Sequence, residues 1–219
     1  DVYKRQLFNR MLGATVHTFD LEEFEQGCEA LLASLSASGK TVYQIPAGGS
    51  NAIGALGYSH CLSELVTQAP FKLSQIVHAS ASAGTQAGLV FANAVEHHNI
   101  DILGINVFHP DPESLRQRIN GLYHSMSERF NTAQAPKEPT IDINHAYFGS
   151  AYGQPTEAAK DAIRMFAESE GLLLDPVYSG KAAAGLIDQI TLGNFDHHDN
   201  VVFIHTGGAA SLSAYDNEF

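Results

Sequence analysis

The chain of 219 residues is long enough for one large domain or two small ones. Its hydrophobic fraction of 44% and charged fraction of 16% are typical of a chain that buries a core, which excludes wholesale disorder. Twenty-four acidic residues against 12 basic ones give a formal charge of -12, which disfavours binding to nucleic-acid phosphates. Because the sequence contains neither an apolar run of membrane-spanning length nor a signal-peptide pattern, we expect a soluble protein without membrane or nucleic-acid partners.

The metal-binding residue types do not form a recognisable site in the sequence. The two cysteines, Cys28 and Cys61, make neither a disulfide framework nor a metal knuckle. The histidine pairs 97–98 and 197–198 lie in polar turns without a third ligand at suitable spacing. We therefore expect no metal, and a reducing compartment, the cytoplasm.

The N-terminus has unusual features for a natural start. The chain begins with Asp1 instead of Met, and three of its 12 basic residues fall within the first ten positions. We therefore expect the chain to be a fragment whose residues 1–6 are a cloning or assembly scar.

Short apolar runs alternate with longer amphipathic stretches along the chain. The pattern predicts strands at 42–45, 75–79, 101–108, 141–148 and 201–205. It predicts helices from 51 to 68, 85 to 97, 111 to 130, 156 to 170 and 180 to 192. Strands that alternate with helices indicate a three-layer α/β fold, with a mostly parallel sheet covered on both faces.

Glycine-rich turns recur where the predicted strands end and helices begin, at 48–51, 82–85, 179–180 and 206–208. The carboxyl ends of parallel strands gather on one edge of a sheet, where ligands bind. Small residues there let backbone N–H groups approach an anion, and a helix N-terminus adds partial positive charge. Tight turns explain any one such loop equally well. A phosphate-bearing ligand and plain turn geometry both remain open at this point.

Known nucleotide-binding patterns are missing. The sequence contains neither a Walker loop nor the dinucleotide fingerprint G-x-G-x-x-G, since Gly84 and Gly88 give only G-x-x-x-G. This disfavours an NTPase and an NAD-type oxidoreductase. A monophosphate held by Ser82, Gly84 and Thr85 fits the sequence better.

Four motifs, in order, resemble those of the D-cysteine desulfhydrase and 1-aminocyclopropane-1-carboxylate (ACC) deaminase family. They are the segments 45–58, 82–89, 174–181 and 203–209, and the resemblance extends from about Leu7 to the end of the chain. Members of this family are pyridoxal-phosphate enzymes with the tryptophan-synthase β-like fold (fold type II). The resemblance therefore implies that fold, incomplete at its N-terminus, together with pyridoxal 5'-phosphate as cofactor, a small amino-acid substrate and a homodimer.

The resemblance also implies roles for individual residues. Tyr152 and Tyr178 match the family's two substrate-facing tyrosines and are the expected catalytic residues. The expected substrate-binding residues are Gly49 and Ser50. The expected cofactor-binding residues are the phosphate-loop residues and two others near the pyridine ring: Ser82, Ala83, Gly84, Thr85, Gln86, Ser179 and Thr206.

Two positions separate the branches of the family. ACC deaminases carry a glutamate at the position of Ser179 and a leucine at that of Thr206, so this sequence has the desulfhydrase-like choice. A neutral hydroxyl at the pyridine nitrogen gives a weaker electron sink than a carboxylate, and thiolate loss requires less carbanion stabilisation than ring opening. We expect β-elimination, from D-cysteine to pyruvate, ammonia and hydrogen sulfide. ACC deaminase and L-cysteate sulfo-lyase are the alternatives, and Ser179 and Thr206 argue only against the first.

The family's Schiff-base lysine lies far upstream, in a Gly-Asn-Lys-like segment that this chain lacks. Of the six lysines, Lys181 follows a motif tyrosine closely, but family members carry this lysine in addition to the catalytic one. We therefore expect residues 1–49 to be the remnant of a small domain and 50–219 the bulk of the large cofactor-binding domain. We expect the piece alone to be poorly soluble and inactive, and a non-catalytic remnant is a further alternative.

Overall fold

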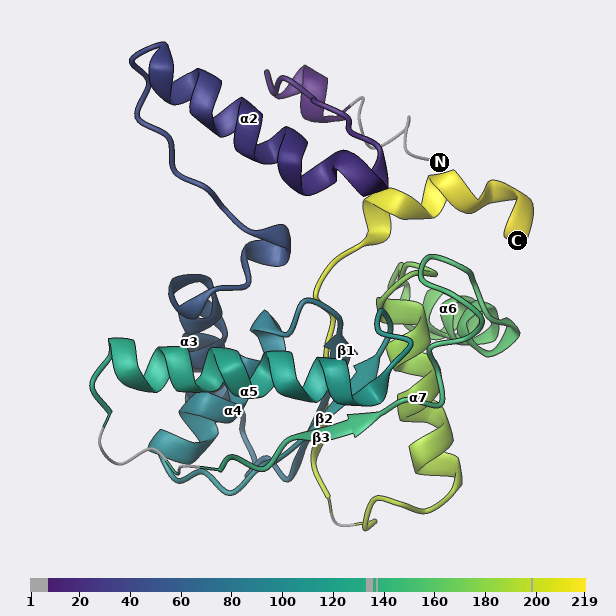
Figure 1. Cartoon of the computed structure of the whole chain (residues 1–219). Coiled ribbons are helices and arrows are strands. Elements are labelled where there is room, and N and C mark those ends of the chain that lie inside the picture. The colour runs from purple at the N-terminus through teal and green to yellow at the C-terminus, as the bar shows by residue number, and fades with distance from the viewer. Residues whose placement is uncertain (1–7, 133–135, 137, 198) are drawn as a thin grey trace. The chain divides into compact units, whose positions relative to one another are not determined.

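The computed structural model describes residues 8–132, 136, 138–197 and 199–219 (Figure 1). The expected scar at residues 1–6, and His198 of the second histidine pair, lie outside the described residues. The chain divides into two compact units, one up to Pro46 and the other from Ala47 to Phe219.

The first unit is mainly helical. It contains a 3-10 turn, η1 (Leu21–Glu23), and helix α2 (Phe24–Ala37), which has no buried residues. The prediction of a strand at 42–45 is wrong: the segment makes no strand pairing with any described part of the chain. Tyr43 and Ile45 are 70% and 71% exposed, so the apolar run has neither a partner strand nor a core to cover it.

A four-stranded parallel sheet forms the centre of the second unit. Its strands are arranged in the order β3-β2-β1-β4 and comprise β1 (Gln75–Ser80), β2 (Asp101–Asn106), β3 (Asp142–Asn144) and β4 (Val201–Ile204). The strands predicted at 75–79, 101–108 and 201–205 are confirmed. The one predicted at 141–148 is shorter than expected, because the Asn144 side chain accepts a hydrogen bond from the Ala146 N–H and turns the chain.

Helices cover both faces of this sheet (Figure 1). On β1, Ile76 packs with Leu62 and Leu89 from the helices of one face. The next residue, Val77, points to the opposite face and packs with Ala182 and Leu186. The first layer contains α3 (Ala52–Gln68), α4 (Gly84–Val95) and α5 (Pro112–Arg129), and the second contains α6 (Glu157–Glu170) and α7 (Ser179–Thr191). The three-layer α/β architecture is therefore confirmed.

Side-chain caps fix the starts of three helices close to where the sequence predicts them. Asn51, Asp111 and Thr156 each accept a hydrogen bond from a backbone N–H in the first turn of α3, α5 and α6. Helix α6 ends at Gly171, whose φ of 67° is the left-handed conformation that glycine adopts readily. A C-terminal 3-10 segment, η3 (Ala209–Glu218), has no counterpart in the sequence prediction.

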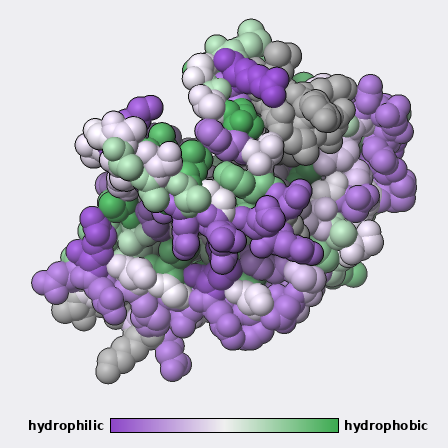
Figure 2. Space-filling model, turned by 45° about the horizontal axis from the view of Figure 1, so that its top comes forward, coloured by the Kyte–Doolittle hydropathy of each residue, from purple (hydrophilic) through white to green (hydrophobic). Residues whose placement is uncertain are grey.

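Hydrophilic side chains occupy much of the face seen in Figure 2, with smaller apolar areas between them. Some of the exposed apolar residues of the second unit lie around the ends of α6 and α7, at Leu172, Leu173, Ile190 and Leu192. None of the helices in the described part of the chain is long and apolar enough to cross a membrane.

His78 is a buried polar residue at the centre of the sheet. It lies on β1, is fully buried, and its Nδ1 is 2.9 Å from the Ala79 carbonyl oxygen. Its Nε2 has no hydrogen-bond partner among the described residues. Burial lowers the pKa of His78 from 6.5 to about 4, because the charged imidazolium is poorly solvated in this position.

This histidine makes stability depend on pH. Below pH 6.5 the unfolded chain binds a proton at His78, whereas the folded protein binds it only below about pH 4. The free energy of unfolding is therefore unaffected by His78 above pH 6.5 and decreases as the pH falls from 6.5 towards 4. We expect a loss of about 2 kcal/mol in the free energy of unfolding between pH 7 and pH 5 from this group alone. Urea unfolding at both pH values measures the loss, and His78→Leu should remove it. An equal pH dependence in the variant would contradict the assignment.

Candidate functional site

A cavity of about 560 Å³ lies at the carboxyl ends of β1 and β4. The chain winds from β1 to β2 and β3 in one direction, whereas β4 lies on the other side of β1. Ligands of open parallel sheets bind at such a reversal of winding. Residues 79–83, at and just after the end of β1, and residues 206–208 after β4 form the wall nearest the sheet. The remaining lining residues are Ala47, Gly48, Tyr58, Thr85, Phe108, His109, Arg118, Tyr152 and Tyr178.

The loop between β1 and α4 presents backbone donors to this cavity. Ala83 immediately precedes α4 in a left-handed conformation, with φ of 77°, and no side chain caps the helix. The first N–H groups of a helix have no intrahelical partner and carry the positive end of its dipole. Since Ser82, Ala83 and Thr85 line the cavity, the start of α4 can bind an anion there.

A second glycine-rich turn packs directly against this loop. The Ser50 and Ser82 hydroxyl oxygens are 2.7 Å apart and hydrogen-bonded. A Cβ at Gly84 would lie 2.7 Å from Ser50 Oγ, and one at Gly48 would overlap the Ser82 side chain. Glycine is therefore required at both positions by close packing. Gly48 lines the cavity, whereas Gly49 and Ser50 do not and lie beside it.

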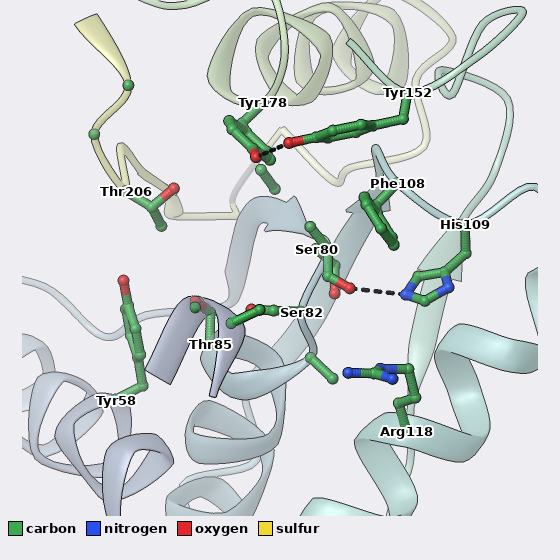
Figure 3. A pocket seen from close by; sticks show the side chains of 17 residues that line it. Tyr58, Ser80, Ser82, Thr85, Phe108, His109, Arg118, Tyr152, Tyr178 and Thr206 are labelled. Carbon is green, nitrogen blue, oxygen red and sulfur yellow. Dashed lines mark hydrogen bonds between the residues drawn. The ribbon is translucent and has the colours of Figure 1, made fainter. Parts of the chain in front are cut away.

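The two expected catalytic tyrosines come together at one end of the cavity. The hydroxyls of Tyr152 and Tyr178 are hydrogen-bonded to each other, with ring centroids 6.0 Å apart (Figure 3). Phe108 packs edge-on against the Tyr152 ring, with the two ring centroids 4.7 Å apart. Thr206, at the end of β4, lines the same cavity. The fold therefore brings together residues that are widely separated in the sequence.

Asp175 holds the start of α7, and with it Tyr178, in place. This fully buried carboxylate accepts hydrogen bonds from the backbone N–H groups of Val177, Tyr178 and Ser179, at 2.8–3.0 Å. It also accepts one from the Ser179 hydroxyl at 2.7 Å, and that hydroxyl accepts one from the Asp175 N–H at 2.8 Å. Ser179 does not line the cavity, and its side chain builds the Asp175 turn.

The side chain of Gln86 is likewise engaged within the protein. Its side chain is fully buried between α4 and the sheet and donates from Nε2 to the Asp142 carbonyl of β3 at 2.6 Å. A Cβ at Gly104 would overlap this amide, so the glycine in β2 makes room for it. The side chain of Gln86 ties α4 to the sheet and does not line the cavity, which leaves only its backbone N–H in the anion-binding turn.

Lys181 is buried below the tyrosine loop. Its Nζ donates to the Phe148 carbonyl at 2.6 Å, and the residue is 0% exposed. Burial lowers the pKa of Lys181, an effect that the Asp175 carboxylate partly opposes. Lys181 does not line the cavity, and none of the described lining residues is a lysine. Lys181 supports the turn at Phe148 and Gly149 that precedes Tyr152.

Sequence reasoning missed two basic lining residues, His109 and Arg118. The Nε2 of His109 is 2.9 Å from the Ala81 carbonyl oxygen, and its backbone N–H donates to Asn106 Oδ1 at 3.0 Å. Because His109 follows β2, the sequence could have predicted its position at the carboxyl edge of the sheet, where ligands bind. Arg118 lies within α5 and no local pattern distinguishes it. The described residues contain no group of three or more His, Cys, Asp or Glu that could hold a metal ion.

Comparisons with known proteins identify the family of the chain. The model of the family described as "Pyridoxal-phosphate dependent enzyme" matches residues 3–207. The D-cysteine desulfhydrase of Klebsiella pneumoniae (strain 342) is 38% identical over 189 residues, and that of Salmonella typhi is 39% identical over 193. These alignments cover 85% of this chain and 56% of each enzyme, so the chain spans little more than half the length of these relatives.

Solved structures share the fold. The crystal structure of an ACC deaminase homologue superposes with a TM-score of 0.84 at 30% identity, covering 96% of this chain and 64% of that one. A hydrogen sulfide-producing enzyme from Fusobacterium nucleatum has a TM-score of 0.62 at 16% identity, covering 94% and 67%, which extends the likeness of the fold alone.

Removing the Asp175 carboxylate should destabilise the protein. Asp175→Ala leaves three backbone N–H groups, two of them fully buried, and the Ser179 hydroxyl without their acceptor, and we expect a loss of about 3 kcal/mol or more in the free energy of unfolding. Urea unfolding measures it. Asp161→Ala is the matched control, since Asp161 is an exposed partner of Arg164, and its loss should stay below about 1 kcal/mol. Equal losses in the two variants would contradict the role of Asp175.

Proposed function

Because the chain belongs to the family of pyridoxal-phosphate dependent enzymes, we propose that it is the cofactor-binding part of a D-cysteine desulfhydrase-like carbon–sulfur lyase. The observation that carries the proposal is the meeting of the anion-binding turn, the tyrosine pair and Thr206 in one cavity. The proposal includes a homodimer in the cytoplasm. It also assigns residues 1–49 to a small domain and 50–219 to the large cofactor-binding domain.

The cavity suits pyridoxal phosphate in size and chemistry. Its volume of about 560 Å³ is within the range of sites for small ligands, about 300–1,000 Å³. Ser80 lines it, is 1% exposed, and its hydroxyl has no hydrogen-bond partner among the described residues. Such a buried hydroxyl beside the open start of a helix is suited to a ligand rich in acceptors, such as a phosphate monoester.

In the proposed complex, the protein binds both ends of the cofactor, the phosphate group and the pyridine ring. The turn from Ser82 through Ala83 and Gly84 to Thr85, with the backbone of Gln86, binds the phosphate. Thr206 lies at the pyridine nitrogen. The cofactor, when bound, supplies an electron sink for the substrate's α-carbon. The lysine that carries it lies outside the lining described above, and we propose that it comes from another part of the full protein.

The proposed reaction breaks the Cα–H and Cβ–S bonds of D-cysteine. A Cα=Cβ double bond forms as the sulfur leaves as hydrosulfide, which takes up a proton to give hydrogen sulfide and so balances the proton lost from Cα. The resulting enamine tautomerises to an imine, which water hydrolyses to pyruvate and ammonia. Tyr152 and Tyr178 share a hydrogen bond, and a phenol both donates and accepts, so this pair holds and moves a proton at the substrate. Gly49 and Ser50 contribute to substrate binding from beside the cavity, where Ser50 positions the turn through its hydrogen bond to Ser82.

The main alternative is ACC deamination, favoured by the structural likeness to an ACC deaminase homologue. The higher identity to the desulfhydrases and the neutral hydroxyl of Thr206 favour β-elimination. Because the Ser179 hydroxyl is engaged with Asp175, only Thr206 now carries the electronic part of that argument. L-Cysteate is a further candidate substrate, since its sulfite leaving group departs from the same carbon.

The test uses the protein expressed from the start codon of its own reading frame and supplied with pyridoxal phosphate. We expect D-cysteine to yield sulfide and pyruvate in equal amounts, with slower or no turnover of L-cysteine, L-cysteate and ACC. Formation of α-ketobutyrate from ACC at a higher kcat/KM would assign the alternative function. Failure to turn over any of the four would overturn the proposed activity.

The tyrosine pair gives a sharper prediction. Tyr178→Phe removes one hydroxyl, and we expect kcat for D-cysteine to fall about 100-fold or more, because the proton relay is lost, while the Kd of pyridoxal phosphate changes less than about threefold. Tyr152→Phe should have a similar effect.

Tyr123→Phe is the matched control for these two variants. This change removes a hydroxyl that donates to the Pro136 carbonyl, away from the cavity lining, and kcat should stay within twofold of the wild-type value. Wild-type kcat in Tyr178→Phe would contradict the proposed role.

A further inference from the structure

Arg118 is the one permanently charged residue among the described residues that line the cavity. It lies in α5, and the rest of the lining consists of small, hydroxyl-bearing and aromatic residues and His109. The whole chain has a formal charge of -12, so the positive charge of this guanidinium is opposite in sign to the net charge of the protein. A cation in this setting creates a local preference for an anionic group.

Helix packing places Arg118 beside the start of α4. Ala83, the residue that precedes α4, packs with Leu115 and Ile119 of α5. Residues three apart on a helix are neighbours, so Arg118 lies at the flank of this contact face. Figure 3 shows its guanidinium on the side of the cavity near Ser82 and Thr85, with the tyrosine pair on the opposite side of the view.

The guanidinium is available for a ligand. On the same helix, Arg116 is engaged, since it lies 3.9 Å from the Glu113 carboxylate and donates to the Ile141 carbonyl. For Arg118 there is no carboxylate within ion-pair distance in the described part of the chain. Arginine presents five N–H donors in a planar fork that matches the oxygens of a phosphate.

Three features therefore meet on one side of the cavity. They are the uncapped start of α4, the buried and unpartnered Ser80 hydroxyl, and the Arg118 guanidinium. The helix end supplies only partial charge, about half an elementary charge, whereas a phosphate monoester near pH 7 carries between one and two. We propose that Arg118 is an anion-binding residue that binds the phosphate group held at the start of α4. This inference rests on the cofactor assigned under the proposed function.

The position of Arg118 separates this role from recognition of the substrate. Tyr152 and Tyr178, where the substrate binds in the proposed function, lie across the cavity from Arg118 in Figure 3. A substrate carboxylate near the tyrosines is therefore further from the guanidinium than a phosphate at Ser82 is. Arg118 determines how tightly the cofactor is held, and acts on the reaction only through that.

The test measures how tightly the full protein binds a ligand that carries a phosphate and the same ligand without it. Titrations with pyridoxal phosphate, and with pyridoxal, which lacks the phosphate, are followed by absorbance for the wild type and for Arg118→Gln. We expect the Kd of pyridoxal phosphate to rise about 10-fold in the variant, and that of pyridoxal to change less than twofold. Inorganic phosphate should compete with pyridoxal phosphate about 10-fold less well in the variant. Arg118→Lys keeps the charge but not the planar fork of N–H donors, and its Kd for pyridoxal phosphate should lie between those of the wild type and Arg118→Gln.

Arg129→Gln is the matched control, because Arg129 lies in the last turn of the same helix and its loss changes the net charge equally. Its Kd for pyridoxal phosphate should equal that of the wild type. Glutamine is a good helix former, and unchanged circular dichroism verifies that Arg118→Gln folds.

Three results with the Arg118→Gln variant would overturn the inference. They are an unchanged Kd for pyridoxal phosphate, an equal loss for pyridoxal, and a raised KM for D-cysteine with cofactor binding intact, which would assign Arg118 to the substrate carboxylate. Failure of the proposed activity is distinguishable from these, because a wild type that binds pyridoxal phosphate but releases no sulfide still reports the phosphate dependence. A wild type that binds pyridoxal as tightly as pyridoxal phosphate would also overturn the inference.

Discussion

The pairing of β1 with a parallel neighbour on each side is the constraint on which the cavity depends. Its register with β2 and β4 brings Ser80 level with Asn106 and sets the end of β1 beside the end of β4. The turn that starts α4 and the turn that carries Thr206 therefore open on the same edge. If either pairing slipped by one residue, the alternation of Ile76 and Val77 between the two helical layers would be reversed.

Residues beside the cavity hold its turns in place. Ser50 binds the Ser82 hydroxyl, His109 contacts the Ala81 carbonyl, and Asp175 binds the backbone at Tyr178. Each contact joins segments whose backbone has no regular partner, so each replaces the hydrogen bonds that a sheet or helix would have provided. Preorganisation of this kind keeps polar groups aimed at a ligand without a further ordering cost when the ligand binds.

The sequence predicts well what depends on local pattern, and less well what depends on distant partners. The strands at 75–79 and 201–205 follow from short, mainly apolar runs before glycine-rich turns, and the sheet confirms them. The run at 42–45 has a similar composition but no partner strand in the described chain. The sequence motifs include Gln86 and Ser179 but do not show where their side chains point. The Asp142 carbonyl orients the Gln86 side chain, and the buried Asp175 carboxylate orients that of Ser179. Arg118 was missed because only the packing of α5 on α4 brings it to the cavity.

The distribution of charge around the cavity links the proposed chemistry to the fold. The described lining contains an arginine on one side and no carboxylate, while the nearby Asp175 is directed to backbone donors. An anionic phosphate is therefore favoured at the Arg118 side, whereas the tyrosine pair presents its hydroxyls on the other side. Because no described lining residue is a carboxylate that could hold a positive charge on the ring of the proposed cofactor, the lining fits, under the proposed function, a moderate electron sink and a thiolate leaving group. Under the same proposal, ring opening is the less favoured reaction, because it requires stronger stabilisation of a carbanion.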